Sequence, residues 1–261
     1  MRKLTTLAVL GALIILAAPI GLAQRPNKEL QALRRDVKKL TAGQRAMQKE
    51  LQEIKKLLQA EQAAGPAGPA GPQNIFFNME GLPFKGAADS KLVMVELSDY
   101  QCPFCGRYVH ETLPQLERDY IRTGKVKYIF SALPLESLHP QALKAAEAAY
   151  CAGDQAKYWE MHDQLFSNQQ ALGVRELSLH AQVIGLNVPT FQQCLFSEKY
   201  APRVRAGITE ASRIGIQGTP TFLFGFTTPN SSQLKVLKLI SGAQPYIAFK
   251  ATLDSLVNTS Q

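Results

Sequence analysis

Two cysteines three residues apart, Cys102 and Cys105, stand where an apolar run ends and a helical pattern begins. The run Leu92–Leu97 (LVMVEL) has the composition of a buried strand. The helical pattern continues to about Arg122. Pro103 suits the first turn of a helix, where a backbone N–H has no partner to lose. This part of the chain is therefore predicted to be a strand–helix junction of an α/β domain, with both sulfurs at the start of the helix.

The position of the two cysteines predicts redox chemistry. Unpaired N–H groups and the positive end of the helix dipole stabilise a thiolate at Cys102. Cys105, one turn later and more buried, would resolve the mixed disulfide. Half of a zinc site and a purely structural bridge are the alternatives. Zinc needs two further ligands, and the histidines lack the spacing of zinc ligands: His110, His139, His162 and His180. We expect a redox-active pair with no metal and no cofactor.

The other elements follow in the order β-α-β, helices, β-β-α. The run Val126–Ala132 predicts a second strand, parallel to the first because one helix separates the two. Helical patterns cover residues 140–152, 157–166, 175–184 and 189–213, with breaks at Gly153, Gly173, Gly185 and Pro202. Strands at Thr221–Phe226 and Lys235–Ile240 and a closing helix at about 245–257 complete the domain. This order indicates a thioredoxin-like α/β fold with a helical insertion at about 138–213.

Three separate segments carry a resemblance to a known family. They are residues 96–105 (ELSDYQCPFC), 149–162 (AYCAGDQAKYWEMH) and 218–222 (GTPTF). Together they resemble the DsbA-like thiol:disulfide oxidoreductases of the thioredoxin superfamily. The resemblance covers roughly residues 74–258 and does not extend to the chain before them.

The resemblance implies roles for further residues. Thr219-Pro220 would form the cis-proline loop facing the active-site disulfide, with the Thr219 backbone offered to an extended substrate. Glu96, six residues before Cys102, would be the buried acid that relays a proton to or from Cys105, a task suited to a carboxyl whose pKa burial raises. The alternative is an ordinary Glu at an exposed strand end. The Pro-Phe dipeptide departs from the Pro-His pair of the most oxidising members, which removes one candidate stabiliser of the thiolate.

The remaining two cysteines, Cys151 and Cys194, lie 43 residues apart in the helical insertion. Four cysteines in an exported chain can pair off evenly, and similar proteins in some lineages carry a second disulfide here. The resemblance therefore implies a structural Cys151–Cys194 bridge, the alternative being two free buried thiols.

The first residues have the layout of a targeting segment. Arg2 and Lys3 precede an uncharged run from Leu4 to Ala23 that ends in small residues. This pattern is typical of a signal peptide cut after Ala23, although the run is also long enough to be an uncleaved membrane anchor. In either case we expect a periplasmic or otherwise extracytoplasmic protein, where disulfides persist.

A heptad repeat occupies residues 24–64. Apolar residues recur at steps of three and four, the pattern of a coiled coil: Leu30, Leu33, Val37, Leu40, Met47, Leu51, Ile54 and Leu58. A single amphipathic helix, lying on its own domain or on an anionic membrane, is the alternative. Val37 with Leu40 suits a dimer, whereas Leu51 at position a with Ile54 at position d favours three strands or more. Residues 65–73 are three collagen-like triplets (GPAGPAGPQ), which could continue a three-stranded axis or form a stiff spacer. We predict a homo-oligomer, a trimer slightly before a dimer, followed by the domain at 74–261.

The net charge of +8 is concentrated near the start of the chain. Residues 24–64 contribute +5, while residues 65–261 contribute only +1. This distribution gives no reason to expect a nucleic-acid partner for the folded domain. The expected partners are exported client proteins with cysteines and, as the resemblance implies, a membrane redox partner that recycles the site.

Three functions fit these residues. The first is oxidation, the formation of disulfides in exported proteins through Cys102-Pro103-Phe104-Cys105. The second is disulfide isomerisation or reduction by an oligomer, in which tethering raises the effective concentration of several sites around one client. The third is a non-catalytic adaptor, or a Cu(I)-binding protein using the two thiolates. The DsbA-like domain places oxidation first.

Overall fold

A computed structural model describes residues 28–63, 75–227 and 231–259 of the chain. The chain divides after Ala67 into two compact units, which are described separately. The predicted signal peptide or anchor at 1–23 and the collagen-like triplets at 65–73 lie outside the described residues.

The first unit contains one long helix, α1 (Lys28–Ala63). The apolar heptad side chains whose placement is described are exposed by 46 to 72%: Leu30, Leu33, Val37, Leu40, Met47 and Leu51. The side chains of Ile54 and Leu58 are not among the described ones. The single chain therefore presents an apolar seam along α1. None of the helices within the described ranges is sufficiently long and apolar to cross a bilayer.

The second unit is built on a mixed sheet with the strand order β1-β6-β5-β3-β4-β2 among its described residues. At its centre, β3 (Leu92–Ser98) runs parallel to β4 (Lys127–Ala132) and antiparallel to β5 (Thr221–Phe226). Beyond β5 lies β6 (Gln233–Ser241). These four strands agree with the sequence patterns. The edge strands β1 (Phe76–Asn78) and β2 (Phe84–Lys85) were not predicted, because runs of three and two residues are too short to show alternation.

The helix predicted to run from the cysteines to Arg122 is divided into three pieces. The first is α2 (Pro103–Glu111), followed by α3 (Leu113–Leu116) and a π-helical turn, η1 (Glu117–Ile121). The prediction of one continuous helix was wrong because Pro114 has no N–H to give to the preceding turn. The chain bends at Thr112 instead.

The helical stretch predicted over residues 189–213, with a break at Pro202, is two helices, α7 (Val188–Phe196) and α8 (Ala201–Arg213). The break lies before Pro202 and includes Glu198, whose φ is +53°. Pro202 stands in the first turn of α8, where its missing N–H costs nothing. Proline therefore begins this helix rather than interrupting it.

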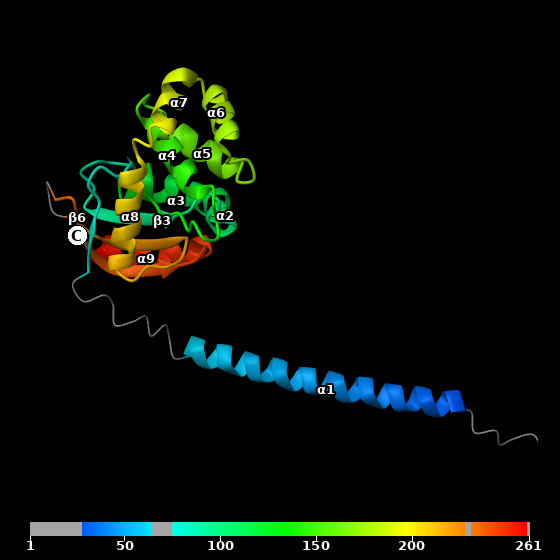
Figure 1. Cartoon of the computed structure of the whole chain (residues 1–261). Helices are drawn as coiled ribbons and strands as arrows, with labels where there is room; N and C mark the ends of the chain where they lie inside the picture. Colours follow the sequence, from blue (N-terminus) through cyan, green and yellow to red (C-terminus); the bar gives the residue numbers. More distant parts are fainter. Residues whose placement is uncertain (1–27, 64–74, 228–230, 260–261) are drawn as a thin grey trace, which may run out of the picture. The chain divides into compact units, whose positions relative to one another are not determined.

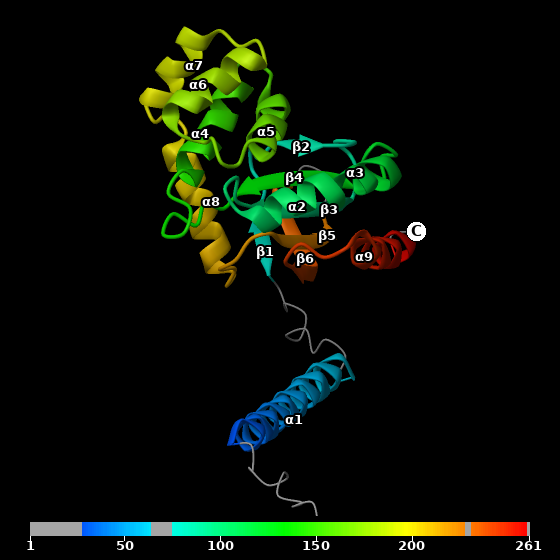
Figure 2. The same cartoon turned by 90° about the vertical axis from the view of Figure 1, so that its right-hand side faces the viewer.

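The helical insertion gathers at one end of the sheet in both views (Figures 1 and 2). It contains α4 (Ala142–Gly153), α5 (Tyr158–Ser167) and α6 (Val174–Val183) together with α7. From there α8 returns along the sheet, and the closing helix α9 (Tyr246–Thr259) follows β6. The chain thus leaves the sheet after β4 and comes back to it at β5.

Alternate residues of β3 pack on the two faces of the sheet, and all seven are buried. Met94 packs on one face in a core shared with Tyr108 of α2 and Phe249 of α9. Val93 and Val95 pack on the other face with residues that include Ala211 of α8. Burial on both faces explains the nearly continuous apolar run in the sequence. It also gives the carboxyl end of β3 a rigid support.

Candidate active site

The two cysteines lie at the start of α2, directly after β3. Cys102 is the N-cap residue of the helix, with extended backbone angles (φ −74°, ψ 121°). Its N–H donates to the Asp99 carbonyl over 3.1 Å, and its own carbonyl accepts from the Gly106 N–H over 3.1 Å. Cys102 retains 4% of its surface exposed, whereas Cys105 is fully buried. The outer sulfur is therefore the one that another molecule can reach.

The two sulfurs differ in acidity. The pKa of Cys102 falls to about 5, first because the Cys105 thiol hydrogen-bonds to it, and further because the backbone N–H groups of Cys105 and Phe104 point to it. Burial raises the pKa of Cys105 well above its ordinary value, although its sulfur accepts a hydrogen bond from the Asp99 N–H over 3.5 Å. At neutral pH the reduced site holds a thiolate at Cys102 and a thiol at Cys105.

The loop before β5 faces Cys102. The Thr219–Pro220 peptide bond is cis. The Cys102 sulfur lies 3.6 Å from the carbonyl oxygen of Thr219, a residue 117 positions further along the chain. The Gly242 N–H donates to the Pro220 carbonyl and ties this loop to the end of β6. Thr219 and Pro220 are therefore placed beside the cysteines, as the resemblance implied.

Glu96 is fully buried on β3 rather than exposed at a strand end. The Tyr128 hydroxyl donates to its Oε2 over 2.5 Å, while its Oε1 has no hydrogen-bond partner. Burial raises the pKa of Glu96 to about 7. The hydroxyl of Ser98, two residues further on the same face of the strand, lowers the pKa of both Glu96 and Cys105. A carboxyl with a pKa of about 7 thus stands on the strand that leads to the two cysteines, and Ser98 adjoins both this carboxyl and the Cys105 thiol.

Asp99 supports the turn between β3 and α2, a role that the sequence did not predict. Its buried carboxylate accepts from the Gln101 N–H over 2.7 Å and from the Leu135 N–H over 2.8 Å. The same carboxylate lies 2.9 Å from Nδ1 of His139. An Asp three residues before the first cysteine is a typical turn signal, but the distant partners leave no mark in the sequence.

Gln169, between α5 and α6, also contacts this turn. Its side-chain amide donates to the carbonyls of Tyr100 and Cys102 over 2.9 and 2.8 Å. Sequence reasoning missed this residue completely, since a polar residue in a loop carries no local signal of such a contact.

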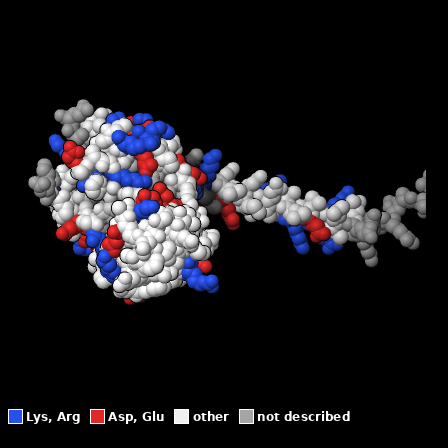
Figure 3. Space-filling model, turned by 90° about the horizontal axis from the view of Figure 1, so that it is seen from above, with Lys and Arg blue, Asp and Glu red and all other residues white. Residues whose placement is uncertain are grey.

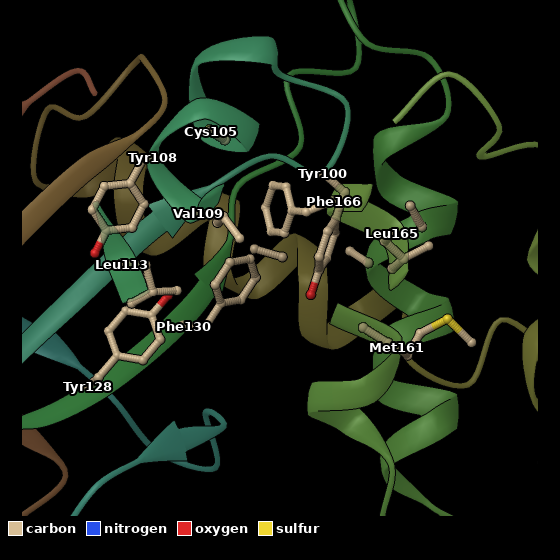
Figure 4. Packing of buried hydrophobic residues seen from close by; sticks show 14 of the residues in the cluster. Tyr100, Cys105, Tyr108, Val109, Leu113, Tyr128, Phe130, Met161, Leu165 and Phe166 are labelled. Atoms are coloured by element: carbon tan, nitrogen blue, oxygen red, sulfur yellow. The ribbon is translucent and has the colours of Figure 1, made fainter. Parts of the chain in front are cut away.

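Aromatic packing joins the site to the helical insertion. Figure 4 shows Tyr100 lying between the strand that carries Phe130 and the helix that carries Phe166. The ring centres of these residues are 5.2 and 4.9 Å from that of Tyr100. The insertion and the cysteine-bearing turn therefore share one core.

The other two cysteines, Cys151 and Cys194, form a disulfide between α4 and α7. Their sulfurs are 2.01 Å apart and their Cα atoms 5.8 Å apart. The bridge lies within the helical insertion and joins the two helices at a separation of 43 residues. In the described ranges no three or more His, Cys, Asp or Glu side chains come together as a possible metal site.

Comparison with known proteins identifies the family. A family model described as thioredoxin matches residues 79–237, which is more than half of the chain. The chain therefore belongs to the thioredoxin family.

Two solved structures have a similar fold. Oxidised BdbD from Bacillus subtilis is similar with a TM-score of 0.61 and 23% identity, over 70% of this chain and 96% of that one. The α-DsbA1 of Wolbachia pipientis has a TM-score of 0.60 and 22% identity, over 70% and 94%. The predicted thioredoxin-like fold with a helical insertion is confirmed.

Curated relatives match shorter stretches. A probable disulfide bond formation protein D from Bacillus anthracis is 27% identical over 143 residues, which are 52% of this chain and 66% of that protein. The Na(+)/H(+) antiporter NhaA 3 of Salinispora tropica is 34% identical over 138 residues, 53% of this chain. The chain covers only 21% of that antiporter's length.

Proposed function

We propose that this protein is an extracytoplasmic thiol:disulfide oxidoreductase that forms disulfides in exported proteins through Cys102 and Cys105. One observation carries the proposal: an accessible sulfur at a helix start faces a cis-proline loop, and a second, buried sulfur stands one turn behind it. The targeting pattern at the start of the chain supports the extracytoplasmic location.

The reaction is two successive thiol–disulfide exchanges. A client thiolate attacks the Cys102 sulfur of the Cys102–Cys105 disulfide, a mixed disulfide forms, and Cys105 leaves. A second client thiolate then attacks the client sulfur of the mixed disulfide, and Cys102 leaves as a thiolate. The client loses two electrons and gains a disulfide, while the enzyme is left as a dithiol. A leaving thiol with a low pKa departs faster, so the pKa of about 5 at Cys102 favours this second step.

Glu96 supplies a proton to the first step. Cys105 leaves into a buried site, where its pKa is raised and a bare thiolate is costly. With a pKa of about 7, Glu96 is partly protonated at neutral pH and can act as the acid. In the reverse direction the carboxylate is the base that takes the Cys105 proton.

After each cycle the dithiol must return its two electrons. The family resemblance makes a membrane redox partner the proposed acceptor, with the clients being exported proteins that contain cysteines. The face of the globular unit seen in Figure 3 carries Lys and Arg interspersed with Asp and Glu. Such a surface fits recognition of many clients by their backbone and thiols better than recognition of one strongly charged partner.

Isomerisation or reduction by an oligomer is the second candidate, and the exposed seam of α1 favours it. Burying such a seam against other copies of α1 would bring several Cys102 sites to one client, which raises their effective concentration. A trimer is preferred slightly over a dimer because of the Leu-Ile pattern in the last heptads.

The direction of the reaction is tested with the full chain on two substrates, reduced ribonuclease and scrambled ribonuclease. An oxidase restores activity to reduced ribonuclease, and does so equally well when Leu33 and Leu40 are both replaced by Lys to break the α1 seam. Isomerase activity on scrambled ribonuclease that disappears with this double substitution would favour the second candidate.

Two cysteine variants test whether the site is catalytic at all. Cys102→Ser is expected to abolish both activities. In Cys105→Ser, the Cys102 thiolate is expected to attack a disulfide of scrambled ribonuclease, release one client thiolate and remain trapped as a mixed disulfide, visible as a higher-mass species on non-reducing gels. Client oxidation that survives Cys102→Ser would overturn the enzymatic proposal and favour an adaptor or a Cu(I)-binding protein.

A further inference from the structure

The side-chain amide of Gln169 joins the helical insertion to the backbone of Cys102. It lies in the loop between α5 and α6, 67 residues after Cys102 in sequence. Both protons of its amide nitrogen are used on the turn, one on the Tyr100 carbonyl and one on the Cys102 carbonyl. The Gln169 side chain therefore holds two backbone carbonyls, that of Tyr100 and that of Cys102, the N-cap residue of α2.

Gly106 makes room for this amide. A Cβ atom at position 106 would lie 2.1 Å from Oε1 of Gln169, far inside contact distance. Glycine within a helix costs about 1 kcal/mol relative to alanine, so its presence in the first turns of α2 calls for a reason. The close approach of Gln169 supplies that reason, and the Gly106 N–H donates to the same Cys102 carbonyl.

Cys102 depends on its backbone for orientation. A helix normally begins with an Ser, Thr, Asp or Asn side chain that caps the first N–H groups, but the Cys102 side chain makes no capping hydrogen bond. The backbone around Cys102 must then be held by other means if the first N–H groups of α2 are to point at its sulfur. Gln169 holds the carbonyl of the peptide group that follows Cys102, and also the carbonyl of Tyr100 two residues before it.

We propose that Gln169 is a positioning residue: through the Tyr100 and Cys102 carbonyls it fixes the turn that directs the N–H groups of α2 at the Cys102 sulfur. This inference deepens the proposed function, because it concerns the same sulfur. The helical insertion thereby sets the reactivity of the thiolate as well as contributing to the core.

The test replaces Gln169 by Met, which has a similar length and volume but no amide protons. Gln170→Met is the matched control, since Gln170 is the next residue, has the same side chain and is exposed. The readout is the thiolate fraction of Cys102 in the reduced full chain, followed by absorbance at 240 nm and by the rate of alkylation with iodoacetamide against pH. Neither measurement needs a client protein.

We expect Gln169→Met to raise the pKa of Cys102 by about half a pH unit, consistent with the loss of a hydrogen bond. At a pH below the pKa, the thiolate fraction of the variant should then be roughly threefold smaller than that of the wild type. Gln170→Met should leave the pKa unchanged. Gly106→Ala is the independent second variant, because its new Cβ displaces the Gln169 amide, and it should shift the pKa in the same direction.

A folded Gln169→Met protein with the wild-type pKa at Cys102 would overturn the inference. A purely structural role predicts a lower midpoint of urea unfolding with no change in that pKa, so unfolding curves accompany each titration. If wild-type Cys102 titrates as expected but oxidises no client, the proposed function fails while this inference stands.

Discussion

At the scale of single residues, the Glu96 carboxyl is fully buried, an environment far from that of a glutamate in water. A carboxyl group is rarely buried without a partner for both oxygens, yet one Glu96 oxygen has none and the other has only the Tyr128 hydroxyl. The raised pKa of about 7 follows from this burial. The family resemblance implied a buried acid at this position, but Tyr128 became its hydrogen-bond partner only through the pairing of β3 with β4.

Replacing Glu96 by Gln tests its role in proton transfer. The rate at which Cys105 resolves a mixed disulfide between Cys102 and glutathione should rise with pH through about 7 in the wild type, because ionised Glu96 takes the Cys105 proton. In Glu96→Gln this rise should vanish and the rate at pH 7.5 should drop about a hundredfold. Stopped-flow measurement of glutathione release checks both. The control is Glu111→Gln on the exposed side of α2, which should behave as wild type; an unchanged profile in Glu96→Gln would refute the relay.

The same substitution changes the pH dependence of stability. The pKa of Glu96 is 4.5 in its ordinary state and about 7 in the fold, so the folded protein holds the proton more tightly. The contribution of Glu96 to the free energy of unfolding is therefore highest below pH 4.5, falls as the pH rises to 7, and stays level above that.

The free energy of unfolding of Glu96→Gln minus that of wild type should increase from pH 4 to pH 8 by on the order of 3 kcal/mol. Urea unfolding of both proteins at the two pH values measures the gain, and taking their difference cancels the titration of Cys102. A difference that does not grow with pH would show that Glu96 is ionised in the fold at low pH.

At the scale of elements, β3 and α2 carry the two cysteines, and the helical insertion contacts the turn between them through Gln169. The strand and helix carry the sulfurs, and both were visible in the sequence because apolar runs and C-x-x-C are local patterns. The break of α2 before Pro114 and the start of α8 at Pro202 were less predictable. Proline removes one N–H in either case, and only the neighbouring turn decides whether a helix ends or begins there.

The Cys151–Cys194 bridge is expected to stabilise the insertion. Closing a loop of 43 residues removes conformational entropy from the unfolded chain worth about 4 kcal/mol. Replacing both cysteines by Ala should lower the free energy of unfolding by about that amount, measured by urea unfolding under non-reducing conditions. Replacing Cys102 and Cys105 by Ala is the control, since their loop is short. An equal loss in the two double variants would contradict a special role for the bridge.

For the molecule as a whole, the predicted oligomer rests on the exposed apolar side chains of α1. Its exposed apolar seam repeats every heptad, and charged side chains at these positions would remove the gain from burying it. The full chain should sediment as a trimer or dimer, and the variant with Leu33→Lys and Leu40→Lys as a monomer.

Analytical ultracentrifugation distinguishes these states. Lys49→Gln, on the opposite side of the heptad pattern, is the matched control and should keep the wild-type mass. A wild-type chain that is monomeric at all concentrations would rule out the oligomeric stalk and with it the argument for isomerisation.

Local patterns were sufficient for the four longer sheet strands, the helix start at the cysteines and the heptad helix, because each depends on residues within a few positions of one another. Contacts between distant residues were decided by the packing of the chain. Cys102 meets Thr219 across 117 residues, Asp99 meets His139 across 40, and Gln169 meets Cys102 across 67. No periodicity links such pairs, since a loop side chain has no partner until the sheet and the helical insertion have packed around it. The cysteines therefore mark the chemistry in the sequence, and the fold supplies the groups that tune it.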